Sequence, residues 1–453
     1  MDANQVAAET PGSAESKSEG PEGMGMLTPD TPFPTPEPLL GASDRPRVVI
    51  IGAGFGGLEA ANALARAPVE AVIVDQHNHH CFQPLLYQVA TAALASADIA
   101  WPIRSIVHNQ QNARVVMARV VGIDKERKLV KTVLGSFSYD FLVLATGATH
   151  SYFGHEEWSA FAPGLKQLAD ATKIRTQILL AFERAELTQN DEERRRLMTF
   201  VVIGGGPTGV EMAGAIAEVA RQTLRSDFRR IDPELARTVL IEAGPRLLAS
   251  FPDNLSRYAA AALKWKGVDV RTGTRVTNCD ASGVSIGDQR IEAATLIWAA
   301  GVIASPAAEW LGASHDHAGR ILVNPDLSVG DSADIYAIGD TAAVKDASGH
   351  PVPGVAPAAK QMGRYVGDRI AAKLAGATPP ETFIYRDLGD LATIGRKAAV
   401  VRIGGMQLTG FVGWVFWSIV HIFFLIGARD RVVVAVNWAW NYLTFQRGAR
   451  LIT

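Results

Sequence analysis

Long apolar runs that each lead into a glycine-rich turn are the clearest pattern along the chain. Residues 47–67 predict a buried strand, a tight turn and an Ala/Leu-rich helix, and residues 69–76 predict the next strand. A strand, a helix and a second strand in this order are typical of a βαβ unit. Residues 141–148 predict a further buried strand, which ends in small residues.

The same pattern begins again in the middle of the chain. Residues 199–222 predict a strand, a glycine turn and a helix, and residues 238–244 predict the strand that follows. Residues 295–302 stand after this second unit as residues 141–148 stand after the first, and residues 335–340 predict a strand that ends on an acid. The repeat predicts an α/β fold with two Rossmann-like dinucleotide-binding domains, the second inserted in the first.

Five regions follow from this reading. The first dinucleotide-binding domain is expected to be discontinuous, over residues 46–160 and 305–400, with the second over residues 161–304. Residues 1–45 are rich in Pro, Gly, Ser, Thr and Glu, a composition that favours a disordered extension over a segment that docks on the body. Residues 401–453 differ from the rest in composition and form a separate C-terminal region.

The charge of the chain is unevenly distributed. Of 453 residues, 48% are hydrophobic and 20% are charged, which excludes disorder as the overall state, and a net charge of −2 argues against a nucleic-acid partner. Residues 1–45 carry a net charge of −6 and residues 401–453 a net charge of +4. No secretory signal is recognisable, and an acidic N-terminus is unlike a mitochondrial transit peptide.

The two cysteines, Cys81 and Cys279, lie far apart in the sequence. They exclude a disulfide framework and a cysteine-rich zinc or iron–sulfur site, so no metal is predicted. We expect both to be inert structural thiols. Without a redox-active cysteine pair, electrons are expected to pass directly to an external acceptor.

The first glycine motif is Gly52-x-Gly54-x-x-Gly57, with Asp75 at the end of the next strand. The first glycine permits the tight turn, the second lets the backbone approach a pyrophosphate, and the third lets helix and strand pack closely. The acid is placed to accept hydrogen bonds from an adenosine ribose. The motif therefore predicts a dinucleotide site, the alternative being a packing turn without a ligand.

The second motif is Gly204-x-Gly206-x-x-Gly209, with Glu242 in the place of the ribose-binding acid. A carboxylate here accepts the ribose 2′-hydroxyl and repels a 2′-phosphate, which favours NADH over NADPH, although the nearby Arg246 can weaken that preference. Two dinucleotide sites in one chain favour FAD together with NADH, with hydride passing from the nicotinamide to the flavin.

The C-terminal region is rich in aromatic residues and in arginine. Residues 411–427 form an uncharged run, which GARDR interrupts before residues 432–445. A spanning helix needs about 20 apolar residues, so this run is short for one. An in-plane helical membrane anchor that contacts anionic lipid fits best, with a spanning helix and a soluble core or dimer face as alternatives. An anchor would place the acceptor in the bilayer, which points to a quinone.

The motifs together resemble one family. GAGFGGLEAA, VDQHNHHCFQPLLYQVAT, LATGA, VVIGGGPTGVEMAG, IWAAGV, IYAIGD, KQMGRYVG and the C-terminal HIFFLIGARDR and NWAWNYLTFQRGARL are similar to type II NADH dehydrogenases, which are single-chain, non-pumping NADH:quinone oxidoreductases. The resemblance covers about residues 46–453. It implies a peripheral enzyme on the cytoplasmic face of the inner membrane, with quinone and anionic lipid as partners and a homodimer as a possible assembly.

The resemblance also implies which residues form the sites. The residues implied for FAD are Gly52, Gly54, Phe55, Gly56, Gly57, Asp75, Gln83, Val120, Ala145, Thr146, Gly147 and Asp340. The residues implied for NADH are Gly204, Gly206, Gly209, Glu211, Glu242 and Gly301. Glu211, Lys397 and Gln361 are implied as catalytic, and Pro357, Ala358 and Gln361 as the quinone site.

Several of these roles have structural alternatives. Asp340 and Glu211 are also placed to cap or stabilise a helix start, Lys397 to be a solvated strand residue, and Gln361 to lie on a helix surface. The family's quinone motif, A-Q-x-A-x-Q, reads APAAKQ here, with Pro357 in place of the first Gln. This departure weakens the quinone assignment. The rival functions are a sulfide:quinone or other FAD-dependent reductase of the same fold, and a nucleotide-sensing flavoprotein with little turnover.

Overall fold

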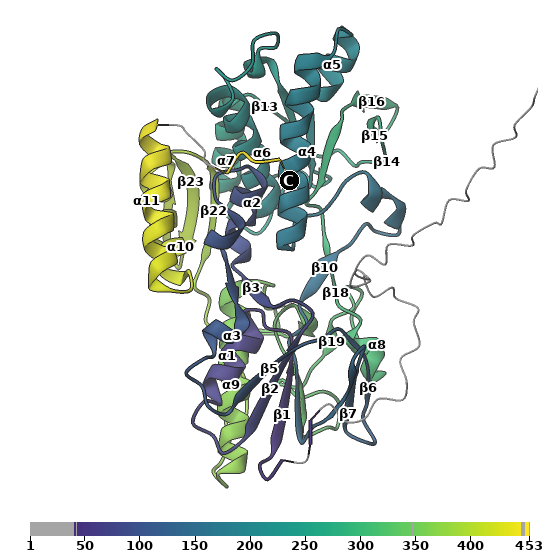
Figure 1. Ribbon diagram of the computed structural model, residues 1–453, viewed down its shortest axis with the longest axis vertical. Coiled ribbons are helices and arrows are strands. Elements are labelled where there is room, and N and C mark those ends of the chain that lie inside the picture. Colours follow the sequence, from purple (N-terminus) through teal and green to yellow (C-terminus); the bar gives the residue numbers. More distant parts are fainter. Residues whose placement is uncertain (1–39, 42, 347, 445–448, 453) are drawn as a thin grey trace, which may run out of the picture.

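The computed structural model describes residues 40–41, 43–346, 348–444 and 449–452 (Figure 1). The predicted disordered extension over residues 1–45 therefore lies almost entirely outside the described residues.

The first sheet has five parallel strands in the order β20-β9-β1-β2-β5. They are β1 (Arg47–Ile51), β2 (Glu70–Asp75), β5 (Ala113–Met117), β9 (Phe141–Leu144) and β20 (Ile335–Ala337). Every residue of β1 is buried, as expected of a central strand covered on both faces. The strands predicted within residues 47–67, 69–76, 141–148 and 335–340 are therefore confirmed.

Glycines let two helices pack closely beside the first sheet. Helix α1 (Phe55–Ala63) runs against α9 (Ala356–Leu374). A Cβ added at Gly363 would stand 2.1 Å from the Gly56 carbonyl oxygen, and one at Gly367 would stand 2.8 Å from the Ala60 carbonyl oxygen. The middle of α9 is thus packed directly against the backbone of α1, which follows the first glycine turn.

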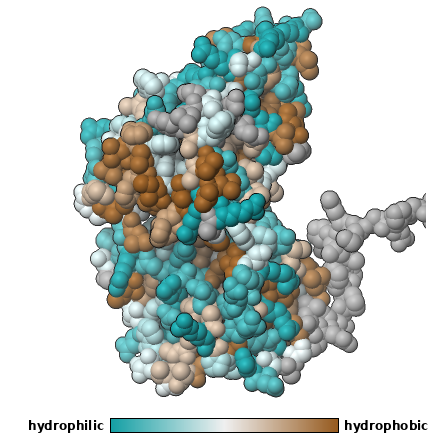
Figure 2. All heavy atoms as spheres, turned by 60° about the vertical axis from the view of Figure 1, so that its left-hand side comes forward, coloured by the Kyte–Doolittle hydropathy of each residue, from teal (hydrophilic) through white to brown (hydrophobic). Residues whose placement is uncertain are grey.

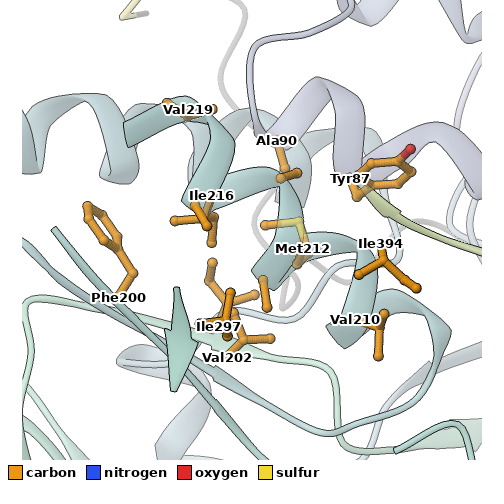
Figure 3. Packing of buried hydrophobic residues seen from close by; sticks show 14 of the residues in the cluster. Tyr87, Ala90, Phe200, Val202, Val210, Met212, Ile216, Val219, Ile297 and Ile394 are labelled. Carbon is orange, nitrogen blue, oxygen red and sulfur yellow. The ribbon is translucent and has the colours of Figure 1, made fainter. Parts of the chain in front are cut away.

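The second sheet repeats the parallel arrangement in the order β13-β12-β11-β17. Its strands are β11 (Thr199–Ile203), β12 (Arg237–Ile241), β13 (Val268–Arg271) and β17 (Thr295–Trp298), and its neighbouring helices are α4 (Leu168–Leu187), α5 (Asp191–Leu197), α6 (Pro207–Glu218) and α7 (Asp253–Trp265). Helix α6 is buried, and Figure 3 shows its Ile216 next to Phe200 and above Ile297 of the sheet.

The chain leaves the first sheet after β9 and returns to it at β20, so the second sheet is formed from residues between these strands. The outgoing β10 (Ala148–His150) and the returning β18 (Val302–Ala304) pair antiparallel and join the two halves. The second sheet thus lies, in chain order, between two strands of the first.

Shorter elements complete these two halves. The remaining strands are β3 (His79–Cys81), β4 (Ala100–Pro102), β6 (Val120–Asp124), β7 (Leu129–Thr132), β8 (Gly135–Ser138), β14 (Asn278–Asp280), β15 (Gly283–Ile286), β16 (Gln289–Glu292), β19 (Ile321–Leu322) and β21 (Ala342–Ala343). The remaining helices are α2 (Leu86–Ala90), α3 (Ile103–Ile106) and α8 (Ala307–Leu311).

The C-terminal unit is a small antiparallel sheet covered by two helices. Its elements are β22 (Asp390–Gly395), β23 (Ala398–Ile403), β24 (Met406–Thr409), α10 (Gly410–Phe424) and α11 (Ala428–Thr444). The boundary expected after residue 400 falls inside β23. The apolar run of residues 411–427 ends as a helix at Phe424, and Gly427 turns the chain with a φ of +82°.

Helices α10 and α11 form the left edge of Figure 1. Both helices expose apolar side chains. Figure 2 turns this side forward and shows hydrophobic residues gathered in the upper half of the molecule. The exposed residues are Phe411, Val412, Ile419, Phe423, Phe424, Val432, Val436 and Trp440, which we call the apolar face. In the part of the chain that the structure describes, every helix is too short or too polar to cross a membrane.

Candidate functional site

Each glycine of the first motif has a distinct steric role. Gly52 has a φ of +101°, and a Cβ there would stand 2.3 Å from the Ala145 carbonyl oxygen. A Cβ at Gly57 would stand 1.8 Å from the Gly52 carbonyl oxygen, so the third glycine lets α1 pack against the turn. Gly54 has open space where a Cβ would be, which leaves room for a ligand at the helix N-terminus.

The second motif repeats this geometry. Gly204 has a φ of +111°, and its Cβ would stand 2.4 Å from the Ala299 carbonyl oxygen. A Cβ at Gly209 would stand 1.8 Å from the Gly204 carbonyl oxygen, whereas the Cβ position of Gly206 is open. The residues present therefore fit a dinucleotide pyrophosphate at the N-terminus of α1 and another at the N-terminus of α6.

The acid that follows each motif accepts a hydrogen bond from the backbone of its glycine turn. Asp75 Oδ2 accepts a hydrogen bond of 2.7 Å from the Ala53 backbone N–H, and Glu242 Oε2 accepts one of 2.5 Å from the Gly205 backbone N–H. The guanidinium of Arg246 donates to carbonyl oxygens of the loop that follows it, at 2.8 and 2.9 Å. Both acids therefore stand where a ribose would reach, while Arg246 is engaged elsewhere.

The segment after β9 meets the segment after β20 beside the first glycine turn. The Gly147 backbone N–H donates to Thr341 Oγ1 at 2.9 Å, and the Thr146 hydroxyl is hydrogen-bonded to Ser305. Asp340 Oδ2 accepts from Lys166 Nζ at 3.3 Å. The structure thus brings Thr146, Gly147 and Asp340 together with the turn at Gly52, whose predicted neighbour Ala145 is buried.

The remaining predicted cofactor residues lie in several different elements. Gln83 Nε2 donates to the Lys166 carbonyl oxygen at 3.3 Å, which links it to the Asp340 neighbourhood. Gly56 is buried beneath α9, Val120 is buried in β6, and Gly301 follows β17. Phe55 packs edge-on against His80 with ring centroids 4.9 Å apart.

Sequence reasoning missed His80 as part of this site. Its ring is 3% exposed, and its Nδ1 is hydrogen-bonded to the Ala53 carbonyl oxygen at 2.9 Å, within the first glycine turn. Burial lowers the pKa of this imidazole, which favours its neutral form. The HNHHCF run was the available signal, but three histidines close together do not reveal which one points inward.

Glu211 is a buried carboxyl group in α6. Its Oε1 accepts a hydrogen bond of 3.4 Å from the Thr393 backbone N–H, and burial raises its pKa to about 8. The group is therefore protonated at neutral pH. The helix-capping alternative is wrong, because the N-cap of α6 is Gly206 and no side chain caps that helix.

Lys397 is exposed in the turn between β22 and β23, where it has a φ of +63°. The adjoining Arg396 backbone N–H donates to Glu218 at 2.5 Å, which is at the C-terminal end of α6. That end lies about 16 Å along the helix from its glycine turn. The turn that carries Lys397 is thus held at the C-terminal end of α6, and its approach to the flavin ring stays a prediction.

Gln361 lies in α9, and its side-chain amide forms two hydrogen bonds with the backbone of Arg386. Its Nε2 donates to the Arg386 carbonyl oxygen and its Oε1 accepts from the Arg386 N–H, both at 2.9 Å. Pro357 and Ala358 belong to the first turn of the same helix, and Ala358 is 1% exposed. The side chain of Gln361 thus fixes the backbone at Arg386, in addition to any role with a ligand.

The two cysteines have the properties of unreactive thiols. Burial raises the pKa of Cys81, in β3, and of Cys279, in β14, to about 12 each. A thiol with such a pKa is not a thiolate at neutral pH and is a poor nucleophile. Among the residues that the structure describes, no group of His, Cys, Asp and Glu is arranged to hold a metal ion.

Comparison with known proteins defines the family. Residues 46–363 match the model of the pyridine nucleotide-disulphide oxidoreductases. The chain is 42% identical to the type II NADH:quinone oxidoreductase Ndh of Mycobacterium tuberculosis over 93% of both chains, and 40% identical to NdhA of the same organism over 90% of both. The solved structure of NDH2 from Plasmodium falciparum in complex with NADH shares the fold, with a TM-score of 0.82 at 20% identity over 90% of this chain and 100% of that one. The two glycine turns and these matches together show that the chain belongs to the type II NADH:quinone oxidoreductases, within the pyridine nucleotide-disulphide oxidoreductase family.

Proposed function

We propose that this protein oxidises NADH with the help of non-covalently bound FAD and reduces a membrane quinone without pumping protons. The observation that carries the proposal is the pair of matching glycine turns, each with an open second glycine and an acid fastened to the turn. One turn serves a resident dinucleotide and the other an exchanging one. FAD, when bound, supplies two-electron redox chemistry between NADH and quinone.

The residues proposed to hold FAD surround the turn at the start of α1. The backbone around Gly52, Gly54 and Gly57 holds the pyrophosphate, Asp75 accepts from the adenosine ribose, and Asp340 accepts from the ribityl hydroxyls. The other residues proposed to contact FAD are Phe55, Gly56, Gln83, Val120, Ala145, Thr146 and Gly147. These residues belong to the first binding domain, which is proposed over residues 46–160 and 305–400.

The residues proposed to hold NADH surround the turn at the start of α6. Gly204, Gly206 and Gly209 hold its pyrophosphate, and Glu242 accepts from the 2′-hydroxyl. The other residues proposed to contact NADH are Glu211 and Gly301. This site belongs to the second domain, over residues 161–304.

Glu211 is proposed to store the proton that the reaction needs. Oxidation of one NADH and reduction of one quinone to quinol consumes one proton from solution, because hydride carries two electrons and only one proton. The raised pKa of Glu211 keeps a proton on its carboxyl group at neutral pH in a buried position. We retain Lys397 as a candidate catalytic residue, and Pro357, Ala358 and Gln361 as candidates for contact with the quinone.

Glu242 is predicted to set the preference for NADH over NADPH. Changing Glu242→Ala is expected to lower kcat/KM for NADH by about tenfold or more, because a charge-assisted hydrogen bond to the ribose is lost. The kcat/KM for NADPH is expected to rise, because the carboxylate no longer repels the 2′-phosphate. Steady-state rates with both nucleotides measure the change.

Arg246→Gln is the matched control for this prediction. Its guanidinium is engaged with loop carbonyl oxygens, so the preference is expected to stay as in the wild type. Unchanged nucleotide preference in Glu242→Ala would contradict the assignment.

The C-terminal unit, proposed over residues 401–453, is further proposed to attach the protein to the cytoplasmic face of the inner membrane. The apolar face of α10 and α11 supports this, since exposed patches of this kind mark membrane or protein contacts. The net charge of this region overstates its attraction to anionic lipid. Arg402 pairs with Asp387 and Asp390, and Arg450 pairs with Asp227.

Two substitutions on the apolar face test the attachment. Ile419→Asp together with Val436→Asp is expected to lower binding to vesicles of anionic and zwitterionic phospholipid at least about tenfold, because each places a charge where apolar area would be buried. Vesicle flotation measures bound protein.

Leu187→Asp is the matched control, because Leu187 is also exposed but lies at the end of α4. It is expected to bind vesicles as the wild type does. If the double variant also binds vesicles normally but changes from dimer to monomer in gel filtration, the apolar face is a homodimer surface instead.

NADH oxidation by detergent-purified protein, with and without a short-chain quinone, tests the proposed function. Quinone-dependent oxidation of NADH is expected, and its persistence in the Cys81→Ala, Cys279→Ala double variant excludes the cysteine-dependent sulfide:quinone reaction. Tight NADH binding with negligible turnover would instead support the nucleotide-sensing alternative.

A further inference from the structure

The loop that precedes α4 reaches from the second half of the protein to the first. Lys166 lies in this loop, and its ammonium group donates to Asp340, with 3.3 Å between the Nζ and Oδ2 atoms. By the proposed domain boundaries, Lys166 belongs to the NADH-binding domain and Asp340 to the FAD-binding domain. The two side chains are 20% and 22% exposed, so water and salt screen this ion pair less than a pair on the open surface.

Hydrogen bonds hold the backbone of Lys166 at the start of α4. Asp170 Oδ2 accepts from the backbone N–H groups of Lys166 and Gln167, at 2.9 and 2.8 Å. His150, at the end of β10, places its Nε2 3.2 Å from the same oxygen. The Lys166 carbonyl oxygen accepts from Gln83 Nε2. The ammonium group therefore extends from a fixed backbone, and its position follows that of α4.

Asp340 is equally well fixed in the first half of the protein. It lies in the turn after β20, where the adjoining Thr341 is fully buried and accepts a hydrogen bond from the Gly147 backbone N–H. In the part of the chain that the structure describes, only Lys166 donates to the Asp340 carboxylate from a side chain, and it does so at Oδ2. The other oxygen, Oδ1, therefore stays available for the ribityl hydroxyl that Asp340 is proposed to bind.

Few polar contacts of this kind join the two proposed dinucleotide-binding domains. Among the described residues, the only other ion pair between them is that of His150 with Asp170. The chain itself crosses through β10 and β18, which are three residues long each (Figure 1). The halves also meet where α2 packs on α4 and α6 through apolar side chains. Packed helices can slide past one another by small amounts, whereas the ion pair at Asp340 fixes a distance beside the proposed cofactor.

We infer that Lys166 is a positioning residue, which holds the NADH-binding domain at the distance from Asp340 that hydride transfer requires. The inference rests on the proposed function, because it concerns the distance between the two bound dinucleotides. Reaction needs the reacting atoms about 3–3.5 Å apart, and an error of about 1 Å can slow a reaction about a hundredfold. The residues proposed to hold NADH all belong to one domain. Loss of the ion pair is therefore expected to slow hydride transfer without weakening nucleotide binding.

Lys166→Met tests this inference, because it removes the ammonium group and keeps an unbranched side chain. At saturating NADH, the rate at which the flavin absorbance bleaches in an anaerobic stopped-flow experiment is expected to fall at least about tenfold. The flavin content of the purified protein and the Kd for NAD+ are expected to stay unchanged. Lys166→Arg keeps the cation and is expected to recover most of the rate. Lys173→Met is the matched control, because Lys173 is exposed on the same helix, and it is expected to leave the rate unchanged.

Chemical restoration of the ammonium group keeps the test independent of folding. Lys166→Cys, made together with Cys81→Ala and Cys279→Ala, carries one thiol at the position of interest. The thiolate displaces bromide from 2-bromoethylamine and gives an aminoethyl thioether of the length of lysine. This reaction is expected to restore the bleaching rate, whereas alkylation with the neutral reagent iodoacetamide is expected to leave it slow.

Three results would overturn the inference. They are a wild-type bleaching rate in Lys166→Met, a loss of flavin or of NAD+ affinity that accounts for its slower rate, and equal recovery of the new thiol with both alkylating reagents. Wild-type protein that contains flavin but is never bleached by NADH would instead contradict the proposed function.

Discussion

Gly57→Ala is expected to destabilise the protein by several kcal/mol and to yield protein without bound flavin. The added Cβ would stand 1.8 Å from the Gly52 carbonyl oxygen, a distance that no rotamer change relieves because both atoms belong to the backbone framework. Overpacking of a close-packed core costs about 1–3 kcal/mol and more when backbone must move. Urea unfolding measures stability, and the visible absorbance of the purified protein measures flavin content.

Gly54→Ala, at the same turn, is expected to weaken flavin binding without destabilising the fold. The Cβ position of Gly54 is open and its φ is −71°, so alanine fits the protein without strain. The flavin content is expected to fall, because the new methyl group occupies the approach to the pyrophosphate, while the unfolding midpoint of flavin-free protein stays the same. Equal loss of stability in both variants would contradict the division of roles among the glycines.

Glu211→Gln is expected to lower the turnover of NADH with quinone by about a hundredfold, the smaller end of what a positioned acid contributes. In the wild type the proton is present below a pKa of about 8, so quinone reduction is expected to fall as the pH rises through 8. The glutamine variant carries no titratable proton, and its remaining activity is expected to lack this decline. A pH profile of kcat from pH 6 to about 9.5 measures both effects.

The pH dependence of stability tests the raised pKa of Glu211 independently of activity. The folded state holds the proton of Glu211 up to about pH 8, whereas the unfolded chain releases it near the ordinary value of 4.5. The free energy of unfolding therefore falls as the pH rises between these values, and Glu211→Gln is expected to remove that part of the fall.

Glu218→Gln is the matched control on the same helix, because Glu218 is ion-paired with Lys266 at 2.8 Å. It is expected to keep the decline in activity above pH 8. An identical pH profile in Glu211→Gln and the wild type would exclude Glu211 as the proton store.

The glycine turns could be predicted from sequence because their spacing is a local backbone requirement. Gly52 and Gly57 must approach each other within one turn, so six residues contain the whole constraint. The strands beside them were equally predictable, since each is a short apolar run bounded by turn residues.

The positions of other site residues depend on contacts between distant segments. The turn that carries Lys397 is held by a hydrogen bond from the Arg396 backbone N–H to Glu218 of α6, a contact that no local pattern predicts. Gln361 is hydrogen-bonded to the backbone of Arg386, and no local sequence pattern predicts that contact.

The charge and hydropathy of the C-terminal region predict only part of its structure. The apolar run over residues 411–427 is visible in the sequence as one hydrophobic segment, but its length does not show that Gly427 turns the chain into α11. The excess of arginine was visible in the sequence, whereas the pairing of Arg402 and Arg450 with carboxylates of other segments was not. Counting charges along a chain cannot reveal which of them are already neutralised by folding.

Rapid mixing of the purified protein under anaerobic conditions tests directly whether bound flavin passes electrons from NADH to quinone. The protein is mixed first with one equivalent of NADH and then with a short-chain quinone, and its visible absorbance is followed. NADH is expected to bleach the flavin absorbance, and the quinone is expected to restore it at a rate no slower than steady-state turnover. Protein without flavin absorbance, or bleached protein that quinone does not restore, would contradict the proposed function.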